Sequence, residues 1–571
     1  MDAMSATADP AGIAAFTAAG QPFELTDAVV RGAGCRVFRN APRTLNQLYA
    51  QARSHQAQVF TVADGVRLTY GEVFARAAAL AADLAAHGVG RGTHVAIAMR
   101  NCPEWLVAFM AVTALTAVPV LVNSRGAAEE IAASLADTGC RHAVADARRA
   151  ALIERGDCAG LSGVVVGDIP AARAGGPAWR CYQQILARER GAPLPAAECA
   201  SEDPAAIMFT SGTSGQPKAA VLSHIGMLTA LMANQLCAAM LGARMAASLG
   251  VDVATLARAA PQPSTLLVFP LFHTSGCLSV FLTSLTRGGR IVFLPRWSAA
   301  EALRLVQQER VTALPAVPTM LWDLLHSPEL ARSDTSSLVN LGTGGQGLPA
   351  NLLQAIRTAF PRAILGTGYG MTETNGMVSL ALGEEYLAHP ESVGRPLPTA
   401  EIRIVDDADR ELPAGATGEV CIRSAQNMNG YWAHPEGDAQ RLRGGWLHSG
   451  DLGRFDAHGR LHIVARKTDM VISAGENIYC AEVERVLTEH PQVLEAATFG
   501  VPDERLGERL IAVIVARAGS GLDAAQLGEF CRTRLADYKL PRSWHFERGP
   551  LERNAAGKLL KAQLRARLGA G

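Results

Sequence analysis

The sequence has no excess of charge of either sign, because 53 Lys and Arg residues balance 53 Asp and Glu residues. Binding to nucleic acid usually requires a basic excess, so this class of function is disfavoured. Charged residues are also scarce, at 19%, whereas hydrophobic residues reach 49%. A chain of this composition buries a large core and does not stay disordered. Its 571 residues are enough for about four domain-sized units.

The sequence also lacks paired cysteine motifs. Its eleven cysteines are scattered, and no two have the spacing Cys-x-x-Cys. This disfavours structural zinc and a disulfide framework, and it predicts the reduced thiols of a cytoplasmic protein. The N-terminal residues MDAMSATADP contain no basic cluster, so a secretory signal is not expected. His458 and His462 are four residues apart, but the glycine turn between them disfavours a zinc site.

One uncharged run, residues 105–122, is long enough to raise the question of a membrane span. It contains two threonines and Pro119, and it is rich in alanine. We interpret it as a buried helix that ends near Thr116, followed by a buried strand over 118–122. No transmembrane span is therefore expected, although a lipophilic substrate would allow peripheral contact with a membrane.

Helical and short apolar segments alternate from residue 68 onward, which predicts an α/β protein with buried strands. After residue 400 the pattern changes to short alternating strands, and a new α+β unit begins near Arg466. Residues 1–40 form a poorly patterned lead-in, and residues 238–265 have the composition of an insertion. The helices expected from these patterns cover 72–87, 127–135, 300–310, 350–360, 481–490 and 524–535. The expected strands cover 94–99, 142–145, 206–209, 311–316, 338–341, 401–405, 419–423, 470–473, 496–500 and 510–515.

The segment FTSGTSGQPK, residues 209–218, follows an apolar strand and carries small and hydroxylated residues. Its glycines let backbone N–H groups converge on an anion, its hydroxyls are donors, and Lys218 adds a positive charge. This favours phosphate binding over a simple flexible loop. It is not a Walker A motif, because Lys218 follows Gln-Pro and precedes alanine.

A second glycine-rich segment, residues 342–347, matches G-x-G-x-x-G. A dinucleotide fold requires an acidic residue about 20 positions further on, and none is present, so a dehydrogenase is disfavoured. Glycines at a strand exit still allow a flat base to approach the backbone. In residues 366–374, Tyr369 offers a ring for stacking, and Glu373 suits a magnesium ion.

Seven motifs in this order resemble those of the adenylate-forming superfamily, which includes acyl-CoA synthetases, peptide-synthetase adenylation domains and luciferases. The motifs are TSGTSGQPK (210–218), PLFHTSG (270–276), GYGMTET (368–374), GWLHSGDLG (445–453), ARKTD (465–469), GENIYCAEVE (475–484) and RNAAGK (553–558). The resemblance implies a large N-terminal domain of sheets flanked by helices (1–465) and a small mobile α+β C-terminal domain (466–571). It also implies two half-reactions. A carboxylate first attacks MgATP to give acyl-AMP and pyrophosphate, and a thiol then displaces AMP.

The resemblance assigns roles to individual residues. Those implied to bind ATP are Thr210, Ser211, Gly212, Thr213, Ser214, Gly215 and Lys218 at the β- and γ-phosphates, Gly344, Gly345, Gln346, Gly368, Tyr369 and Gly370 at adenine, and Asp451 and Arg466 at ribose. Thr372 is implied to contact the α-phosphate, and Glu373 to hold Mg²⁺ together with Thr210. Lys558 is implied to reach the α-phosphate, where charge develops during adenylation. After the C-terminal domain turns about residues 467–469, Gly475 would lie beside the pantetheine channel.

His273 indicates the branch of the superfamily. Members that activate amino acids carry an aspartate there to pair with the substrate ammonium, and an unpaired buried ammonium would be costly. The resemblance therefore favours an acyl- or aryl-CoA synthetase, with His273 near the substrate carboxylate. The expected substrate is a fatty or other hydrophobic acid, with aryl and alicyclic acids next and CoA as acceptor. A carrier protein as acceptor and a nucleotide sensor without turnover remain alternatives.

Two positions depart from the family pattern in ways that affect these expectations. Gln346 stands where alanine is usual and faces the acyl pocket, and Thr468 stands at the hinge.

Overall fold

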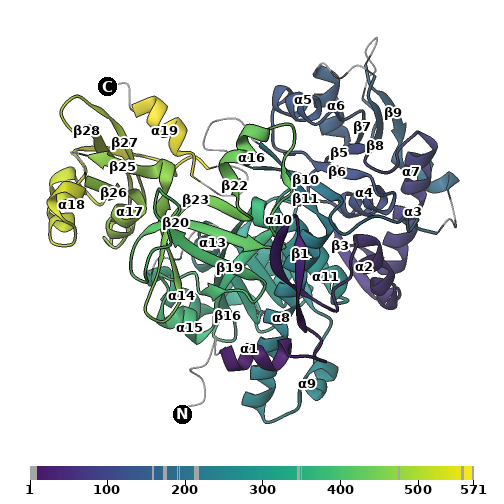
Figure 1. Ribbon diagram of the computed structural model, residues 1–571, viewed down its shortest axis with the longest axis horizontal. Coiled ribbons are helices and arrows are strands. Elements are labelled where there is room, and N and C mark those ends of the chain that lie inside the picture. The colour runs from purple at the N-terminus through teal and green to yellow at the C-terminus, as the bar shows by residue number, and fades with distance from the viewer. Residues whose placement is uncertain are drawn as a thin grey trace.

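The computed structural model describes residues 10–156, 158, 160–170, 176–189, 191, 193–210, 218–343, 348, 350–473, 476–553 and 559–568. Figure 1 shows a large body formed by the first four-fifths of the chain and a smaller C-terminal unit, in yellow-green, at its side. The expected fold class, α/β with a large sheet domain and a smaller C-terminal domain, is confirmed.

The first large sheet is mainly parallel and carries an antiparallel pair at one end. In the described residues its order is β21 (Gly430–Tyr431), β11 (Lys218–Ser223), β10 (Pro204–Thr210), β6 (Val118–Leu121), β5 (His94–Ala98), β7 (His142–Asp146), β8 (Ser162–Val166), β9 (Ala178–Cys181). Its helices are α2 (Leu45–Ala52), η1 (Arg53–His55), α3 (Tyr70–Ala86), α4 (Pro103–Ala114), α5 (Ala128–Asp137), α6 (Ala147–Arg155) and α7 (Tyr182–Arg188).

The second large sheet repeats this plan, with parallel strands that end in an antiparallel pair. Its order is β18 (Arg395–Pro396), β17 (Gly376–Leu382), β16 (Ile364–Met371), β15 (Asn340–Thr343), β14 (Ala313–Ala316), β12 (Ser264–Leu267), β13 (Arg290–Phe293), β3 (Val59–Ala63), β4 (Val66–Thr69). Its helical segments are α8 (His224–Leu249), α9 (Val253–Ala259), α10 (Thr274–Gly276), the π-helical η2 (Cys277–Leu282), α11 (Thr283–Thr286), α12 (Ala299–Gln308), α13 (Pro318–Leu325), η3 (Leu330–Arg332), α14 (Ala350–Ala359), η4 (Thr372–Thr374) and α15 (Glu384–Ala388).

Two smaller sheets follow in the chain. One pairs β19 (Ala400–Val405), β20 (Gly418–Ser424), β23 (Trp446–Phe455) and β22 (Leu442–Arg443), with β24 (Leu461–Arg466) on β23 and α16 (Pro435–Arg441) beside them. The C-terminal sheet pairs β26 (Glu476–Tyr479), β25 (Met470–Ser473), β28 (Gly507–Ala516) and β27 (Val493–Asp503), with β29 (Ser543–Glu547) on β28. Its helical segments are η5 (Lys467–Asp469), α17 (Cys480–Thr488), α18 (Ala524–Arg532), η6 (Asp537–Lys539) and α19 (Lys561–Leu568).

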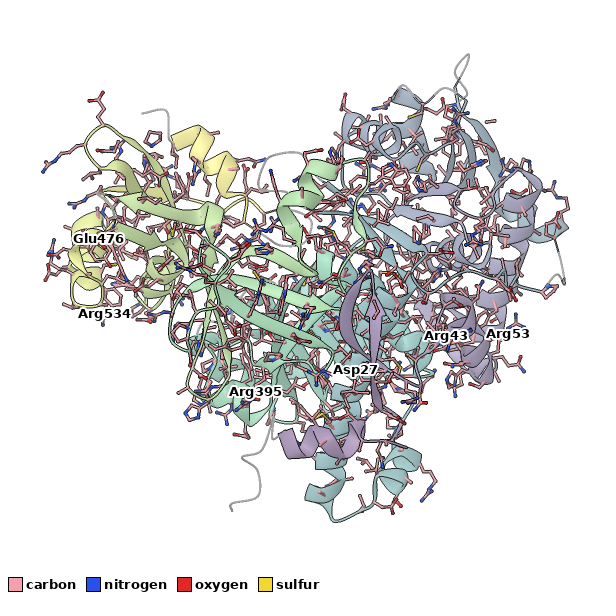
Figure 2. All side chains as sticks on the ribbon, viewed as in Figure 1. Asp27, Arg43, Arg53, Arg395, Glu476 and Arg534 are labelled. Atoms are coloured by element: carbon pink, nitrogen blue, oxygen red, sulfur yellow. The ribbon has the colours of Figure 1, made fainter. Side chains whose placement is uncertain are left out.

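The main core lies between the two large sheets and draws apolar residues from both of them and from α3, α4 and α8. A second core joins the other face of the second sheet to α12, α13 and α14, and a third joins α5 and α6 to the first sheet. Figure 2 shows how densely side chains fill these layers. Local sequence sets the helix starts, as at Thr69, which forms a capping box with Glu72 before α3.

The uncharged run 105–122 is interior, as expected. It forms most of α4 and all of β6, and Trp105 has no exposed surface. Thr116 between them adopts a positive φ of 55°, which is unfavourable for a β-branched residue.

The N-terminal segment differs from the expectation of an unpatterned lead-in. It forms α1 (Pro10–Thr17) and a hairpin of β1 (Leu25–Val30) and β2 (Ala33–Phe38). Asp27, labelled in Figure 2, lies on β1. Arg31 and Gly32 at the turn both have positive φ, as two-residue hairpins require. The sequence did not predict this turn, because arginine is not typical of the first position of a two-residue hairpin turn.

The stretch 238–265 extends α8 and adds α9. By length and composition alone, residues His224–Ala247 of α8 meet the criteria for a membrane-crossing helix, and half of the relevant window is buried in the protein.

Candidate active site

Each large sheet contributes one antiparallel hairpin to the candidate site. In the first sheet, β10 ends at Thr210 and β11 begins at Lys218, and these two residues are paired across the hairpin. The residues between them, Ser211, Gly212, Thr213, Ser214, Gly215, Gln216 and Pro217, lie outside the described residues. The ammonium of Lys218 lies 5.2 Å from the centre of the Tyr431 ring. The expected phosphate-binding lysine therefore stands at the mouth of this hairpin.

In the second sheet, β16 runs into η4, which carries Thr372 and Glu373 at the strand end as expected. The Tyr431 hydroxyl donates a hydrogen bond of 2.8 Å to Oε1 of Glu373. Burial, and next the charge of Glu373, raise the pKa of Tyr431, so its hydroxyl keeps its proton. The tyrosine thus fixes one carboxylate oxygen of Glu373.

The turn after η4 is held by side chains. The Thr374 hydroxyl accepts from the Met371 N–H and donates to the Gly376 carbonyl. Asn375 adopts a left-handed conformation with φ 54°, and its amide donates to the Gln426 carbonyl at 2.6 Å. Asparagine tolerates this conformation better than most residues. These hydrogen bonds fix the turn that follows Glu373.

A second hydrogen-bonded chain joins the expected adenine and ribose positions. The Tyr369 hydroxyl donates to Oδ2 of Asp451 at 2.7 Å, and Nε of Arg466 lies 3.2 Å from Oδ1. Asp451 and Arg466 are also opposite each other in the β23–β24 register. Burial, and next the charge of Asp451, raise the pKa of Tyr369 well above its usual value. Three residues from three motifs therefore form one cluster.

Glycines allow the β16–β17 hairpin to close around Tyr369. A Cβ at Gly370 would lie 1.9 Å from the Gly376 carbonyl oxygen, and one at Gly368 would lie 2.4 Å from the sulfur of Met377. Both positions therefore require glycine. Gly344, Gly345 and Gln346 lie outside the described residues. The strand that leads to them, β15, pairs with β16 in parallel.

His273 precedes α10 and the π-helical η2, a type of helix that often marks functional positions. Burial, and next the charge of Arg125, lower the pKa of His273 to about 4. The imidazole is therefore neutral near pH 7. A neutral imidazole beside an arginine suits an anionic carboxylate better than an ammonium group.

A cavity of about 200 Å³ lies next to this motif. Its lining includes Phe272 and Pro270 of the PLFH segment and three arginines, Arg100, Arg125 and Arg296. Burial, and next the charges of Arg149 and Arg125, lower the pKa of Arg100. Sequence reasoning did not find this cationic cavity, because its arginines are far apart in the chain and form no motif.

Two C-terminal candidates, Lys558 and Gly475, lie outside the described residues. The segments flanking residues 554–558 are anchored by ion pairs of 2.6 Å, from Arg553 to Glu495 and from Lys561 to Glu484. At the expected hinge, the Lys467 ammonium lies 3.1 Å from Glu419 and 3.2 Å from Asp407.

The residues expected at magnesium fit a hard cation in their chemistry. Thr210 and Glu373 offer a hydroxyl and a carboxylate oxygen, which Mg²⁺ prefers as ligands. They come from β10 and η4, which are in contact. Across the described residues, no group of three or more His, Cys, Asp or Glu side chains is arranged to hold a metal by itself. Magnesium commonly combines few protein ligands with substrate phosphates.

This fold and this pair of hairpins define the adenylate-forming enzymes, and the sequence comparison agrees. The family described as AMP-binding enzyme matches residues 48–432, and the AMP-binding enzyme C-terminal domain matches residues 482–558. The chain belongs to this family. The expected activity class, AMP-forming carboxylic acid–CoA ligase with ATP, Mg²⁺ and CoA, is confirmed.

Individual relatives cover nearly the whole chain. A feruloyl-CoA synthase of Amycolatopsis sp. is 36% identical over 506 residues, covering 88% of this chain and 95% of the relative. The long-chain-fatty-acid–CoA ligase FadD13 of Mycobacterium tuberculosis is 32% identical over 506 residues, covering 88% and 93%. The crystal structure of ATP-bound MatB from Rhodopseudomonas palustris has a TM-score of 0.79 and 28% identity, covering 92% and 99%.

Sequence analysis missed Tyr431 as a site residue. It belongs to the two-residue strand β21, which pairs with β11. So short a strand has no periodicity, and only the tertiary structure brings it to Glu373. The available signal was a Gly-Tyr-Trp segment with no helical or strand pattern around it.

Proposed function

We propose that this ligase activates a hydrophobic carboxylic acid, a fatty acid in the first place and an aryl or alicyclic acid in the second. The observation that carries this is His273, which is neutral at pH 7 and lies within the field of Arg125. Both groups attract a carboxylate, and neither pairs with an ammonium. The relatives support either kind of acid, since one is named for ferulate and another for long-chain fatty acids.

In the adenylation step, Lys218 and the Thr210–Gly215 segment bind the β- and γ-phosphates. Tyr369 packs beside the base, and Asp451 with Arg466 binds the ribose. Thr372 donates to the α-phosphate, and Lys558 stabilises the charge that develops there as the carboxylate attacks. Magnesium, when bound at Glu373 and Thr210, neutralises phosphate charge. The Tyr431 hydroxyl holds Glu373 in place for this.

In the thioester step, a C-terminal domain formed by residues 466–571 turns about residues 467–469 and withdraws Lys558. Such alternation lets one site serve two reactions. The ion pairs of Lys467 with Glu419 and Asp407 hold the start of this hinge. Burial raises the pKa of Glu419, but the hydrogen bond from Lys467 outweighs this effect and keeps the pKa of Glu419 below its usual value. Gly475 then lies beside the incoming thiol.

The acceptor we propose is free CoA, in preference to a carrier protein. The relatives support this choice, since the feruloyl-CoA synthase and the long-chain-fatty-acid–CoA ligase are both named for CoA. The eleven free thiols fit a reducing compartment, and we place the enzyme in the cytoplasm.

The deciding experiment measures acid-dependent pyrophosphate release from MgATP. The panel runs from acetate to long-chain, aryl and polycyclic acids, with and without CoA. We expect multiple turnovers with a hydrophobic acid, and only when CoA is present. Release that stops near one equivalent despite CoA would indicate a carrier protein. No release with any acid would contradict the proposed substrate class, and ATP binding would then test a sensor role.

A Lys558→Ala variant tests the assignment of the half-reactions. We expect adenylation to fall by about a thousandfold, a loss typical of a group that stabilises transition-state charge. Thioester formation from preformed acyl-AMP should stay within about threefold of the parent, because Lys558 has withdrawn in that step. Equal loss of both steps would overturn the role given to Lys558.

A further inference from the structure

Helix α16 lies between the first large sheet and the smaller sheet that contains β23. It contacts β21 of the large sheet and β22 and β23 of the smaller one, and Figure 1 shows it, in green, beside β10 and β11. Strand β21 carries Tyr431, and β23 carries Asp451. The helix therefore connects two ends of the candidate site, the end expected at the outer phosphates of ATP and the end expected at its ribose.

One face of α16 is turned toward this site. A Cβ on Gly437 would lie 3.2 Å from the Tyr431 ring and 3.3 Å from the Lys218 ammonium. Asp438 accepts a hydrogen bond of 2.6 Å from the Tyr431 N–H. Arg441 follows Asp438 by three residues and Gly437 by four, so it lies on the same face of the helix. The face that meets Tyr431 and Lys218 thus ends in an arginine.

The guanidinium of Arg441 lies against the turn that precedes Asp451. Its Nη1 donates a hydrogen bond of 2.8 Å to the His448 carbonyl. A Cβ on Gly450 would lie 2.7 Å from Nη1 and 3.3 Å from both Cζ and Nη2. A side chain at position 450 would have to displace the guanidinium, and the φ of 73° favours glycine there as well. One N–H group therefore anchors Arg441 beside the ribose end, and the rest of its donor fork is left for other partners.

The positive charge of Arg441 also reaches the magnesium side of the site. Burial and the charge of Glu373 raise the pKa of the Tyr431 hydroxyl, and the charge of Arg441 opposes them. That hydroxyl donates to Glu373, the carboxylate expected to hold magnesium. The Lys218 ammonium lies near the ring of the same tyrosine. Arg441 thus stands between the turn of Asp451 and the Tyr431–Lys218 pair.

The carboxylates near Arg441 are engaged with other groups. Within the described part of the chain, the guanidinium of Arg441 forms no ion pair, and its hydrogen bond goes to the His448 carbonyl. Glu373, Asp438 and Glu419 accept instead from the Tyr431 hydroxyl, from the Tyr431 N–H, and from the Gly450 N–H with the Lys467 ammonium. A half-buried guanidinium with donors to spare suits an anion with several oxygens, and phosphate is such an anion.

We propose that Arg441, together with Lys218, binds the outer phosphates of ATP and the pyrophosphate that leaves. One guanidinium N–H keeps its bond to the His448 carbonyl, and the others donate to phosphate oxygens. This rests on the proposed function, which puts the ribose at Asp451 and the outer phosphates at Lys218. A phosphate chain that joins these two ends passes the guanidinium. Because AMP has no outer phosphate, Arg441 favours ATP over AMP in the same site.

The test is equilibrium binding of MgATP, magnesium pyrophosphate and AMP to the full-length protein, by isothermal titration calorimetry without acid or CoA. In Arg441→Gln, the Kd of ATP and that of pyrophosphate should each rise about tenfold, the scale of a lost hydrogen bond to a charged group. The Kd of AMP should stay within about twofold of the parent, because AMP offers the guanidinium no outer phosphate. Arg441→Lys keeps the charge but loses the planar fork, so the Kd of ATP should rise only about threefold.

The matched control is Arg410→Gln, which removes an arginine that pairs with Asp406 and whose side chain is 79% exposed. It should bind all three ligands like the parent. If Arg441→Gln weakened AMP and ATP equally, Arg441 would act only by holding the turn of Asp451, and the proposal would be overturned. Unchanged binding of ATP and pyrophosphate, or a parent that binds no ATP, would overturn it too. A parent that binds ATP but releases no pyrophosphate with any acid would contradict the proposed substrate class and leave this result intact.

Discussion

The two hairpins of the site belong to sheets of the same plan but are built differently. The β16–β17 hairpin is fixed by side chains, since Thr374, Asn375 and Tyr431 hold its turn and Glu373. The β10–β11 hairpin carries a glycine- and hydroxyl-rich tip between Thr210 and Lys218. One presents an oriented carboxylate, and the other brings a lysine to its end at Lys218. We infer that the first positions the metal and the α-phosphate, whereas the second surrounds the outer phosphates.

The difference between the two hairpins shows how one site can both orient a charge and release pyrophosphate. An oriented charge is effective because it needs no reorganisation when the reaction occurs. A phosphate tail that must leave as pyrophosphate is better held by many weak donors than by one rigid contact. The following predictions test whether this division is real.

The largest expected effect is that of Glu373→Gln. The amide keeps the shape and can still accept from Tyr431, but it loses the charge that binds magnesium. Adenylation should fall by about a thousandfold, as when a preorganised charged group is removed. Pyrophosphate release measured across a magnesium titration checks this. Glu384→Gln, at the first residue of α15 in the same sheet region, should leave release unchanged; equal loss there would refute the assignment.

The second prediction concerns acid stability next to the β10–β11 hairpin. His224 follows β11 and is 2% exposed. Its Nδ1 accepts a hydrogen bond from the Leu45 N–H. Burial lowers the pKa of His224 to about 4. The unfolded state therefore binds more protons between about pH 6.5 and pH 4, so stability rises with pH across this window and is lost on acidification.

His224→Gln removes this titration. Between pH 7.5 and pH 4.5 the parent should lose about 2.5 kcal/mol more of its unfolding free energy than the variant, from the size of the pKa shift. Urea unfolding at the two pH values measures the difference. His458→Gln, at an exposed position, is the control and should behave like the parent. Parallel losses in the parent and the His224 variant would contradict the prediction.

The third prediction tests the close approach in the β16–β17 hairpin. A Cβ at Gly370 would lie 1.9 Å from a backbone oxygen, so Gly370→Ala must move the hairpin. It should destabilise the protein by about 2 kcal/mol, the usual scale of overpacking. On the adjacent strand β15, a Cβ at Gly342 would meet its nearest atom at 3.9 Å. Gly342→Ala should therefore be neutral, and thermal unfolding of the two variants makes the comparison.

The elements that sequence predicts well are those whose pattern is local. The alternation of helical and short apolar segments over residues 68–145 predicted α3, β5, α4, β6, α5 and β7 close to their observed bounds. It did so because apolar periodicity specifies buried strands and helix faces. Asp451 and Arg466 were expected together, and the β23–β24 register pairs them. Tyr431 and the arginine cavity were not found, because residues distant in sequence create them. The β1–β2 hairpin was missed at an untypical turn.

The fourth prediction concerns the cation of the β10–β11 hairpin. Lys218→Gln keeps a donor but removes the charge, so the KM for ATP should rise about tenfold, as for a lost hydrogen bond to a charged group. The rate of thioester formation from preformed acyl-AMP should not change, because the outer phosphates have left by then. Steady-state kinetics in ATP and single-turnover transfer separate the two. An unchanged KM would remove Lys218 from the phosphate site.

The smallest expected effect is that of Tyr431→Phe, which separates the two hairpins most directly. The ring that faces Lys218 is kept, and only the hydroxyl that fixes Glu373 is lost. If Tyr431 acts by positioning Glu373, the magnesium concentration for half-maximal adenylation rises about fivefold, while the KM for ATP at saturating magnesium stays constant. A purely structural role would instead lower the thermal stability and raise both the half-maximal magnesium concentration and the KM for ATP. A rise in the KM for ATP alone would assign Tyr431 to the lysine hairpin, and the two halves of the site would then form one unit.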